Sequence, residues 1–416
     1  MTKNNRHNII TLNNGLRVVH QQIKSTQLVH CGLFSKTGSR DENLVTNGSA
    51  HFIEHALFKG TKKRRASQLF NLIESVGGEL NAYTTRENTA YYSSSLKRYV
   101  DRNFDLLSDM CFNALLEPKE LEKERKVIFE EIEMYEDSPE ESIYDEFFMN
   151  LYKDHPLGYN ILGTKKSLTG IGQKELKQFI ASQYQPENMV FSVAGNVSQH
   201  RVEQLAYKYL DISIDKVERL TRKAASTTQV FNLELEKDFQ QTHCIYGTEA
   251  YSRYSDKRYA FMLLNNILGG SNMGSRLNLS VREKYGFCYH ISSTFQTFDD
   301  TGVFFVQFGC DKKNLKKTID IINREFKTLC DKPLGPLQLT KAKRQLQGNL
   351  AIMFENPGLQ MQNMAKSIIN FNSIINLKEV FEKIDAITVE DVQNVANEIL
   401  NPSKLSKLVY LGNNED

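Results

Sequence analysis

The sequence predicts an α+β protein with two homologous sandwich-like domains, each an antiparallel-rich sheet packed with helices. Three observations predict this class. Strand-like and helix-like segments are mixed in both halves of the chain, one segment recurs late in the sequence, and 416 residues are enough for two or three domains. We therefore expect two similar units within one chain.

The recurring segment closes each half of the chain. Its first copy runs from Leu168 to Asn196 and its second from Ile384 to Asn413, and both contain a helix, a turn marked by proline and a final strand. The boundary should lie near residues 211–229, where the Lys/Arg-rich stretch after Asp215 is typical of a linker. We expect one domain at 1–215 and a second at 216–416.

Composition and charge exclude several classes of protein. Charged residues make up 25% and apolar residues 40%, which is typical of a soluble globular protein, and a net charge of +2 indicates neither nucleic acid nor an anionic membrane as a partner. The first twenty residues lack the apolar core of a signal peptide, and no apolar run approaches the length of a membrane span. The six cysteines show no CxxC spacing, which favours reduced thiols and a cytoplasmic location.

A short helix is predicted around the pentapeptide HFIEH at residues 51–55. Residues three and four apart share one face of a helix, so His51, Glu54 and His55 point the same way. Two imidazoles on one face can hold a zinc ion, and the carboxylate between them can activate water. The pattern inverts the commoner His-Glu-x-x-His motif. Residues able to cap and to end this helix are Asn47 or Ser49, and Gly60.

A second helix is predicted over Leu121–Asp137, and its apolar stripe contains two carboxylates. Glutamate-rich helices usually face solvent, but a carboxylate within an apolar stripe costs free energy unless it is paired or bound to a metal. A catalytic zinc takes three protein ligands, so we expect Glu131 as the third ligand. Glu124 should orient one of the histidines. The stripe consists of Leu121, Val127, Ile128, Ile132 and Tyr135.

Three stretches together resemble the insulinase/pitrilysin family of zinc peptidases, in particular its two-domain, processing-peptidase-like members: GSAHFIEHALFKGT, GGELNAYTTRENTAYY and ERKVIFEEIEMYED. The resemblance covers essentially the whole chain. It implies that His51, His55 and Glu131 bind zinc, that Glu54 is the general base and that Glu124 supports the site.

The stretch at residues 77–92 lies between the two zinc-binding segments. The Gly77-Gly78 pair predicts a turn, and the Thr/Tyr-rich runs that follow predict a strand hairpin. An exposed strand edge can bind an extended peptide through main-chain hydrogen bonds. In the family this strand is where substrate docks, so the resemblance makes Asn81, Ala82 and Thr84 candidate substrate contacts.

The second half acts as an internal control for the zinc motif. When Lys59-Gly60-Thr61 is placed over Gly269-Gly270-Ser271, the positions of the two histidines and the base are occupied by Phe261, Leu264 and Asn265. Because this copy lacks the motif, we expect one Zn²⁺ per chain.

A different feature of the second half resembles the Arg/Tyr segment of the family. Arg282 and Tyr289 lie seven residues apart. An arginine can hold a substrate carbonyl, and a tyrosine hydroxyl can donate to the oxyanion of a tetrahedral intermediate. Without the resemblance, an arginine in a surface ion pair and a tyrosine packed in a strand would be the better explanation of both residues. Residues 269–272 resemble a shortened glycine-rich loop.

These observations predict a zinc-dependent metalloendopeptidase that cleaves unfolded peptides or presequences. Long members of the family enclose substrate between four such domains, so a two-domain chain is expected to form a homodimer with an enclosed chamber. In it, Arg282 and Tyr289 of one subunit would complete the zinc site of the other. The alternatives are a noncatalytic core subunit of the same fold, the catalytic half of a heterodimeric processing peptidase, and a purely structural zinc, which would normally require a fourth protein ligand.

Overall fold

The computed structural model describes residues 7–219, 221–225 and 228–413. The chain forms two compact units. The first comprises Met1–Ile132, Tyr159–Lys223 and Ile352–Ile375, and the second comprises Glu133–Gly158, Ala224–Ala351 and Asn376–Asp416. The expected division at residue 215 describes the repeat in the sequence, whereas each compact unit also includes a segment from the other half of the chain.

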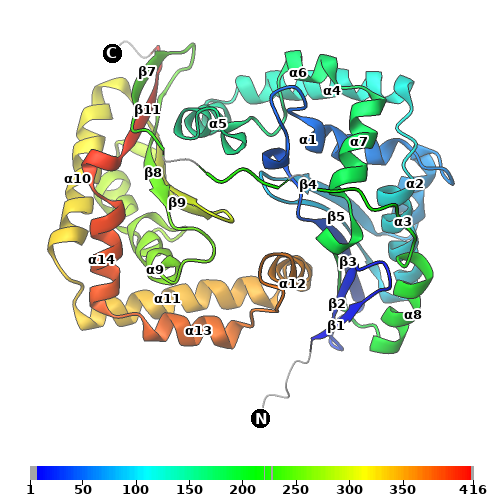
Figure 1. Cartoon of the computed structure of the whole chain (residues 1–416). Helices are drawn as coiled ribbons and strands as arrows, with labels where there is room; N and C mark the ends of the chain where they lie inside the picture. Colours follow the sequence, from blue (N-terminus) through cyan, green and yellow to red (C-terminus); the bar gives the residue numbers. More distant parts are fainter. Residues whose placement is uncertain (1–6, 220, 226–227, 414–416) are drawn as a thin grey trace. The chain divides into compact units, whose positions relative to one another are not determined.

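The first unit contains a six-stranded sheet in the order β1-β2-β6-β3-β5-β4. Figure 1 labels β1 to β5 of this sheet. Its neighbouring strands are antiparallel except for β2 and β6. β4 is a terminal strand and pairs with β5 from Glu79 opposite Ser94 to Thr84 opposite Thr89. The strand bounds are β1 (Asn8–Thr11), β2 (Arg17–Gln22), β3 (Leu28–Ser35), β4 (Glu79–Thr84), β5 (Thr89–Leu96) and β6 (Met189–Gly195).

Helices cover both faces of this sheet. Successive residues of a strand point to opposite faces, and on β6 Val190 packs into a core with α12, whereas Phe191 contacts Phe104 of α3. The first unit contains α1 (Ser49–Ala56), α2 (Ala66–Glu74), α3 (Val100–Asn113), most of α4 (Pro118–Glu136), α6 (Lys165–Gly170), α7 (Gln173–Gln183), α8 (Gln199–Tyr209) and α12 (Pro357–Phe371).

The second unit repeats this plan with a five-stranded sheet in the order β7-β11-β8-β10-β9. Its strands are β7 (Asn232–Glu236), β8 (Thr242–Ala250), β9 (Cys288–Thr297), β10 (Gly302–Cys310) and β11 (Ser406–Leu411). Its helices are α5 (Pro139–Leu151), α9 (Arg258–Gly269), α10 (Leu315–Asp331), most of α11 (Pro336–Glu355), α13 (Leu377–Ala386) and α14 (Val389–Ile399). The predicted class, two α+β units with mainly antiparallel sheets and packed helices, is confirmed.

Each sheet is covered on one face by a helix from the other half of the sequence. α12 packs on β2, β3 and β6, where Met361, Met364 and Ile368 join the core. α5 packs on β8 and β11, where Phe147 and Phe148 are fully buried. The two halves therefore exchange one helix each, an arrangement that periodicity within either half does not reveal.

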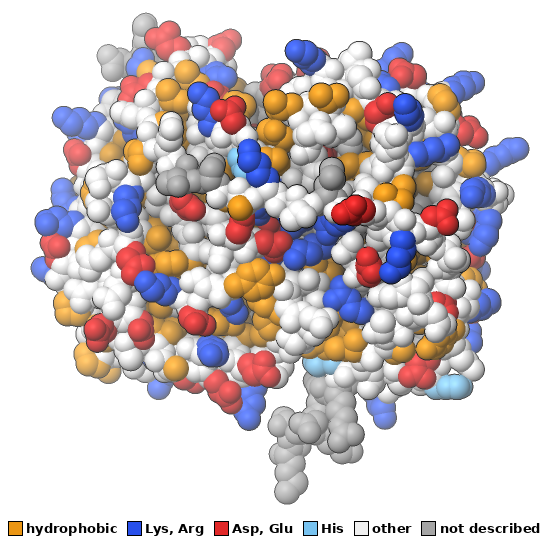
Figure 2. All heavy atoms as spheres, viewed as in Figure 1, with side chains coloured by type: hydrophobic (Ala, Val, Ile, Leu, Met, Phe, Trp, Pro, Cys, Tyr) orange, Lys and Arg blue, Asp and Glu red, His pale blue; other side chains and the backbone are white. Residues whose placement is uncertain are grey.

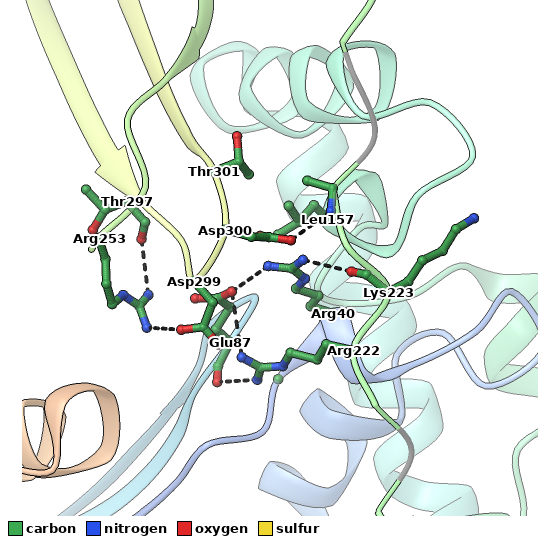
Figure 3. Close-up of polar contacts among 12 residues, drawn as sticks. Arg40, Glu87, Leu157, Arg222, Lys223, Arg253, Thr297, Asp299, Asp300 and Thr301 are labelled. Carbon is green, nitrogen blue, oxygen red and sulfur yellow. Dashed lines mark hydrogen bonds and ion pairs between the residues drawn. The ribbon is translucent and has the colours of Figure 1, made fainter. Parts of the chain in front are cut away.

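The predicted linker is anchored to the first unit. Its described residues up to Lys223 form neither helix nor strand, but Arg222 forms a two-pronged ion pair with Asp41 and donates to the carbonyl of Glu87 at 2.9 Å. The Glu87 carboxylate in turn pairs with buried Arg40 at 2.7 Å, and Arg40 also donates to the carbonyl of Lys223 (Figure 3). Charge-assisted bonds thus fix this part of the linker on the β4–β5 turn.

The surface in Figure 2 carries basic and acidic side chains interspersed with one another, as the small net charge leads one to expect. Among the described helices, none combines the length and the apolar character needed to cross a membrane.

Candidate metal centre

Helix α1 begins differently from the sequence prediction. Its N-cap is Gly48, which has a φ of 95°, and no side chain of this residue can cap the helix. The expectation that Asn47 or Ser49 caps it is wrong, because the carboxylate of Glu42 takes this role by accepting from the backbone N–H groups of Gly48 and Ala50. The α-helix ends at Ala56, and a 3₁₀ turn at Leu57–Lys59 leads to Gly60.

Gly48 is required by its conformation and by its surroundings. A positive φ of 95° disfavours side chains, and an added Cβ would lie 2.8 Å from the carbonyl oxygen of Leu162 and 2.9 Å from Cα of Gly163. The chain at residues 162–163 therefore closes tightly on the start of α1. This contact fixes where the first turn of α1 lies.

Helix α4 presents one buried face toward α1, as predicted. Leu121, Glu124, Ile128 and Ile132 are buried on this face. The prediction that Val127 belongs to the stripe is wrong, because it is 44% exposed: it lies roughly a third of a turn from the line of buried residues. Close to that line lies Arg125 instead, whose guanidinium packs over the Phe52 ring of α1 at 5.4 Å.

The structure brings the three predicted ligands together. His51 Nε2 and His55 Nε2 lie 3.7 Å and 3.4 Å from Glu131 Oε2. One ligand atom from each residue falls within 4.8 Å of the other two. Ligands of a tetrahedral zinc with bonds near 2.0–2.1 Å are about 3.3 Å apart, so the donor types and spacing fit this ion with small adjustments. Among the described residues, no other His, Cys, Asp and Glu side chains converge in this way.

A second layer of charged groups holds His55. Its Nδ1 lies 3.3 Å from Glu124 Oε2, and the other oxygen of Glu124 pairs with Lys59 Nζ at 2.6 Å. A proton on Nδ1 is therefore directed at Glu124, so Nε2 is the atom that could donate its lone pair to a metal once it has lost its own proton. Lys59 was not predicted, although it follows His55 by one helical turn and so shares its face.

The two histidines differ in their electrostatic state. Burial lowers the pKa of His51 to about 4, an effect that neighbouring His55 reinforces. Burial also opposes protonation of His55, but hydrogen bonds to Glu124 and Glu131 outweigh it and raise the pKa to about 9. His51 Nδ1 is buried and has no hydrogen-bond partner among the described residues. His51 is thus neutral at neutral pH and can donate a lone pair to a metal. His55 is positively charged, with both ring nitrogens protonated, while no metal is bound.

Glu54 is held by a residue of the edge strand. Thr84 Oγ1 donates to Glu54 Oε2 at 2.5 Å, which joins β4 to α1. Burial raises the pKa of Glu54, and the bond from Thr84 opposes this rise. The hydroxyl of Thr84 therefore faces the predicted base, while Asn81 lies exposed on the opposite face of β4 and Ala82 shares the face of Thr84. Their contact with a peptide stays a prediction.

The predicted Arg/Tyr pair lies in the second unit. Arg282 belongs to a π-helical turn at Asn278–Glu283, and its guanidinium lies 5.6 Å from the ring centre of Tyr289 on β9. The pairing of β9 with β10 shifts between Cys288 and Ile291, so that Tyr289 and His290 both lie opposite Gly309. This bulge leaves both side chains exposed, and Tyr289 is 84% exposed. The sequence did not predict the bulge.

The equivalent helix of the second unit contains no ligands. Phe261 and Leu264 on α9 are fully buried, and Phe261 packs edge-to-face on Phe304 of β10. The helix that carries the predicted metal ligands in the first unit thus corresponds to a core helix in the second.

An open three-ligand centre with a carboxylate on the same helix is the arrangement of a class of zinc peptidases. Comparison with known proteins agrees with this class. Residues 17–165 match the family described as "Insulinase (Peptidase family M16)", and residues 170–346 match the "Peptidase M16 inactive domain". The chain belongs to this insulinase family of two-domain zinc peptidases.

Relatives of similar length match nearly the whole chain. An uncharacterized zinc protease of Bacillus subtilis is 31% identical over 389 residues, 94% of either protein, and one of Rickettsia felis is 33% identical over 403 residues, 97% of either. The fold matches that of a protease from Helicobacter pylori with a TM-score of 0.87 at 23% identity, over 98% of this chain and 99% of that one.

Proposed function

We propose that the chain is a zinc-dependent endopeptidase that cleaves unfolded peptides or presequences. The observation that carries the proposal is the convergence of His51, His55 and Glu131 beside Glu54. With three protein ligands, a tetrahedral site keeps one position open, as catalytic zinc sites do and closed structural sites do not. The family membership and the names of the relatives support the same conclusion.

Each residue of the centre has a separate role in the proposed cleavage of a peptide bond. Zn²⁺ held by the two histidines and Glu131 would supply a Lewis acid that polarises the scissile carbonyl and makes water more acidic. Glu54 accepts the proton of the attacking water and delivers it to the leaving amine. Its raised pKa suits this exchange near neutral pH, and Thr84 fixes one of its oxygens. The edge of β4 would align an extended peptide beside them.

Cleavage of a quenched fluorescent peptide tests the proposal. We expect hydrolysis by the purified protein that a chelator stops, that added zinc restores, and that Glu54→Gln lowers by at least about 10³-fold while zinc stays bound. Glu130→Gln, an exposed residue of α4, is the matched control and should cleave normally. Bound zinc without cleavage across a varied set of peptides would contradict the proposal and favour a noncatalytic or partner-dependent subunit.

We further propose that two chains form the working enzyme. Arg282 and Tyr289 would complete the zinc site of the partner, with the Tyr289 hydroxyl donating to the oxyanion. The exposure of Tyr289 in the single chain supports a role toward another molecule.

Mixing Glu54→Gln chains with Tyr289→Phe chains tests this assembly. A mixed dimer contains one site with both an intact base and an intact tyrosine, so activity should rise above that of either variant alone. Each variant mixed with itself is the control. No gain after verified exchange of subunits would exclude shared sites.

A further inference from the structure

Helix α1 starts against a buried carboxylate that the catalytic proposal does not use. Glu42 is only 5% exposed, and its two oxygens accept three hydrogen bonds: Oε1 from the N–H of Ala50 at 2.7 Å, and Oε2 from the N–H of Gly48 at 2.8 Å and the Asn47 amide at 3.0 Å. Six residues of chain separate Glu42 from the helix that it caps. The contact therefore joins two segments of the chain and does not belong to a local turn.

The three hydrogen bonds favour the ionised form of the carboxyl group, because both oxygens only accept, but burial has the larger effect on its protonation. Burial raises the pKa of Glu42, to about 8, and the donors from Ala50, Asn47 and Gly48 oppose that rise. The partial positive charge at the start of a helix favours an anion at the same place. A carboxyl group buried at this cost is informative, since a serine or an asparagine would cap a helix with less desolvation.

The segment that carries Glu42 also binds the end of the edge strand. The N–H groups of Ser39 and Arg40 donate to the carbonyls of Thr85 and Arg86, directly after the last residue of β4. Glu42 thus ties the first turn of α1 to the strand whose Thr84 holds Glu54. A helix of eight residues has little stability of its own, so its position depends on such contacts.

We propose that Glu42 is a positioning residue that sets the place of α1, and with it the spacing of His51, His55 and Glu54 relative to Glu131 and Thr84. The effect of Glu42 on catalysis rests on the proposed peptidase function. Glu42 contacts neither substrate nor metal in this assignment, and it acts through the backbone at the start of α1 and through the Asn47 amide.

Glu42→Gln tests the role, with Thr388→Ala as the matched control. Glutamine has a similar shape, but one of its two terminal atoms is an N–H₂ group. This group would face backbone N–H donors and could not accept a hydrogen bond from them. Thr388 caps α14 in the second unit by accepting from the N–H of Asp391, so its loss removes a helix cap away from the centre. Both variants should unfold at lower temperature than the unchanged chain.

The two variants should differ in three further measurements. In Glu42→Gln, zinc affinity measured by chelator competition should fall about tenfold or more, as is typical for groups behind a metal ligand. Amide exchange of residues 49–56 in the metal-free protein should accelerate, and kcat should fall with KM little changed. Thr388→Ala should leave zinc affinity and exchange in α1 within about twofold of the unchanged chain.

Equal behaviour of the two variants would overturn the proposal and reduce Glu42 to a contributor to stability. Should Glu42→Gln fail to fold, Asn47→Ala removes one of the three donors and should weaken zinc binding by about threefold; unchanged affinity would overturn the proposal as well. Zinc affinity and amide exchange do not require cleavage. A protein that binds zinc and never cleaves therefore refutes the peptidase function without deciding about Glu42.

Discussion

The two histidines of α1 are four residues apart, yet their protonation is controlled by different neighbours. His51 lies in the protein interior without a carboxylate on its Nδ1, and its low pKa keeps it neutral. His55 lies between Glu124 and Glu131, which favour its charged form. Lys59 offsets the charge of Glu124 and fixes its orientation. The centre is therefore asymmetric: the proposed ligand His51 is already neutral, whereas His55 must lose a proton before it can bind a metal.

This asymmetry predicts how zinc affinity depends on pH. In the metal-free protein His55 is positively charged below about pH 9. Zinc must displace one of its two ring protons, so the affinity for zinc should rise with pH. Because His51 titrates near pH 4, only one proton is displaced between pH 6 and 9. We expect log Kd to fall by about one per pH unit in this window and to level off above it. Competition with a fluorescent chelator measures this.

Glu124→Gln provides the control for this prediction. Without the negative charge at Nδ1, the pKa of His55 should fall and the plateau should begin at a lower pH. A slope near two in the unchanged chain would show that His51 is also protonated and would contradict the assignment.

The geometry of the centre depends on how helix α1 is held at both of its ends. Its first turn lies against Glu42 and the chain at residues 162–163, and its later turn is held by the bond from Thr84 to Glu54. Helix α4 supplies the remaining ligand from a face that it buries against α1. The spacing of ligands is thus set by contacts between elements and not by any one of them.

Gly48→Ala should disturb this arrangement. A side chain at positive φ costs about 1 kcal/mol, and overlap with Leu162 and Gly163 should bring the loss of unfolding free energy to about 2–4 kcal/mol. Gly77→Ala is the control, since Gly77 also has a positive φ of 72° but has no atoms within 4 Å of an added Cβ. Urea unfolding measures both. Equal losses would mean that the overlap is relieved without cost and that the close approach is unimportant.

The local part of the centre is the part that sequence predicts. The positions of His51, Glu54 and His55 follow from helical periodicity, and buried Glu124 and half-buried Glu131 follow from the apolar stripe of α4. The cap by Glu42 and the bond from Thr84 join residues that are distant in sequence, and no periodicity encodes such pairs. Val127 is apolar but lies roughly a third of a turn from the buried residues of α4, so its apolar character alone predicts the wrong face of the helix.

At the scale of the whole molecule, the repeat in the sequence and the compact units do not coincide. Each sheet buries one face beneath a helix that the other half supplies: α12 for the first unit and α5 for the second. The repeat correctly predicts two similar α+β units. It does not predict the exchange, because the periodicity of a helix shows which of its faces is buried but not which sheet it covers.

Separation of the chain within the linker tests the importance of the exchange. A fragment of residues 1–223 lacks α12, so Val19, Phe34 and Val190 lose their cover on one face of the sheet. We expect this fragment to bind a hydrophobic dye and to unfold without cooperativity, and we expect it to regain a cooperative transition when it is produced together with residues 224–416. A fragment 1–223 that unfolds cooperatively alone would show that α12 is dispensable.

The exchanged helix also imposes an order on synthesis. The first unit holds all the proposed zinc ligands, yet it cannot cover its sheet until residues 357–371 have left the ribosome. At about 5–20 residues per second, the roughly 150 residues that separate Lys223 from the end of α12 take on the order of 10–30 seconds to add. During this interval the apolar face of the first sheet is not yet covered by α12, and chaperones that bind nascent chains have a defined surface to protect. A peptidase assembled in this way would gain a complete active site only when nearly all of its chain exists.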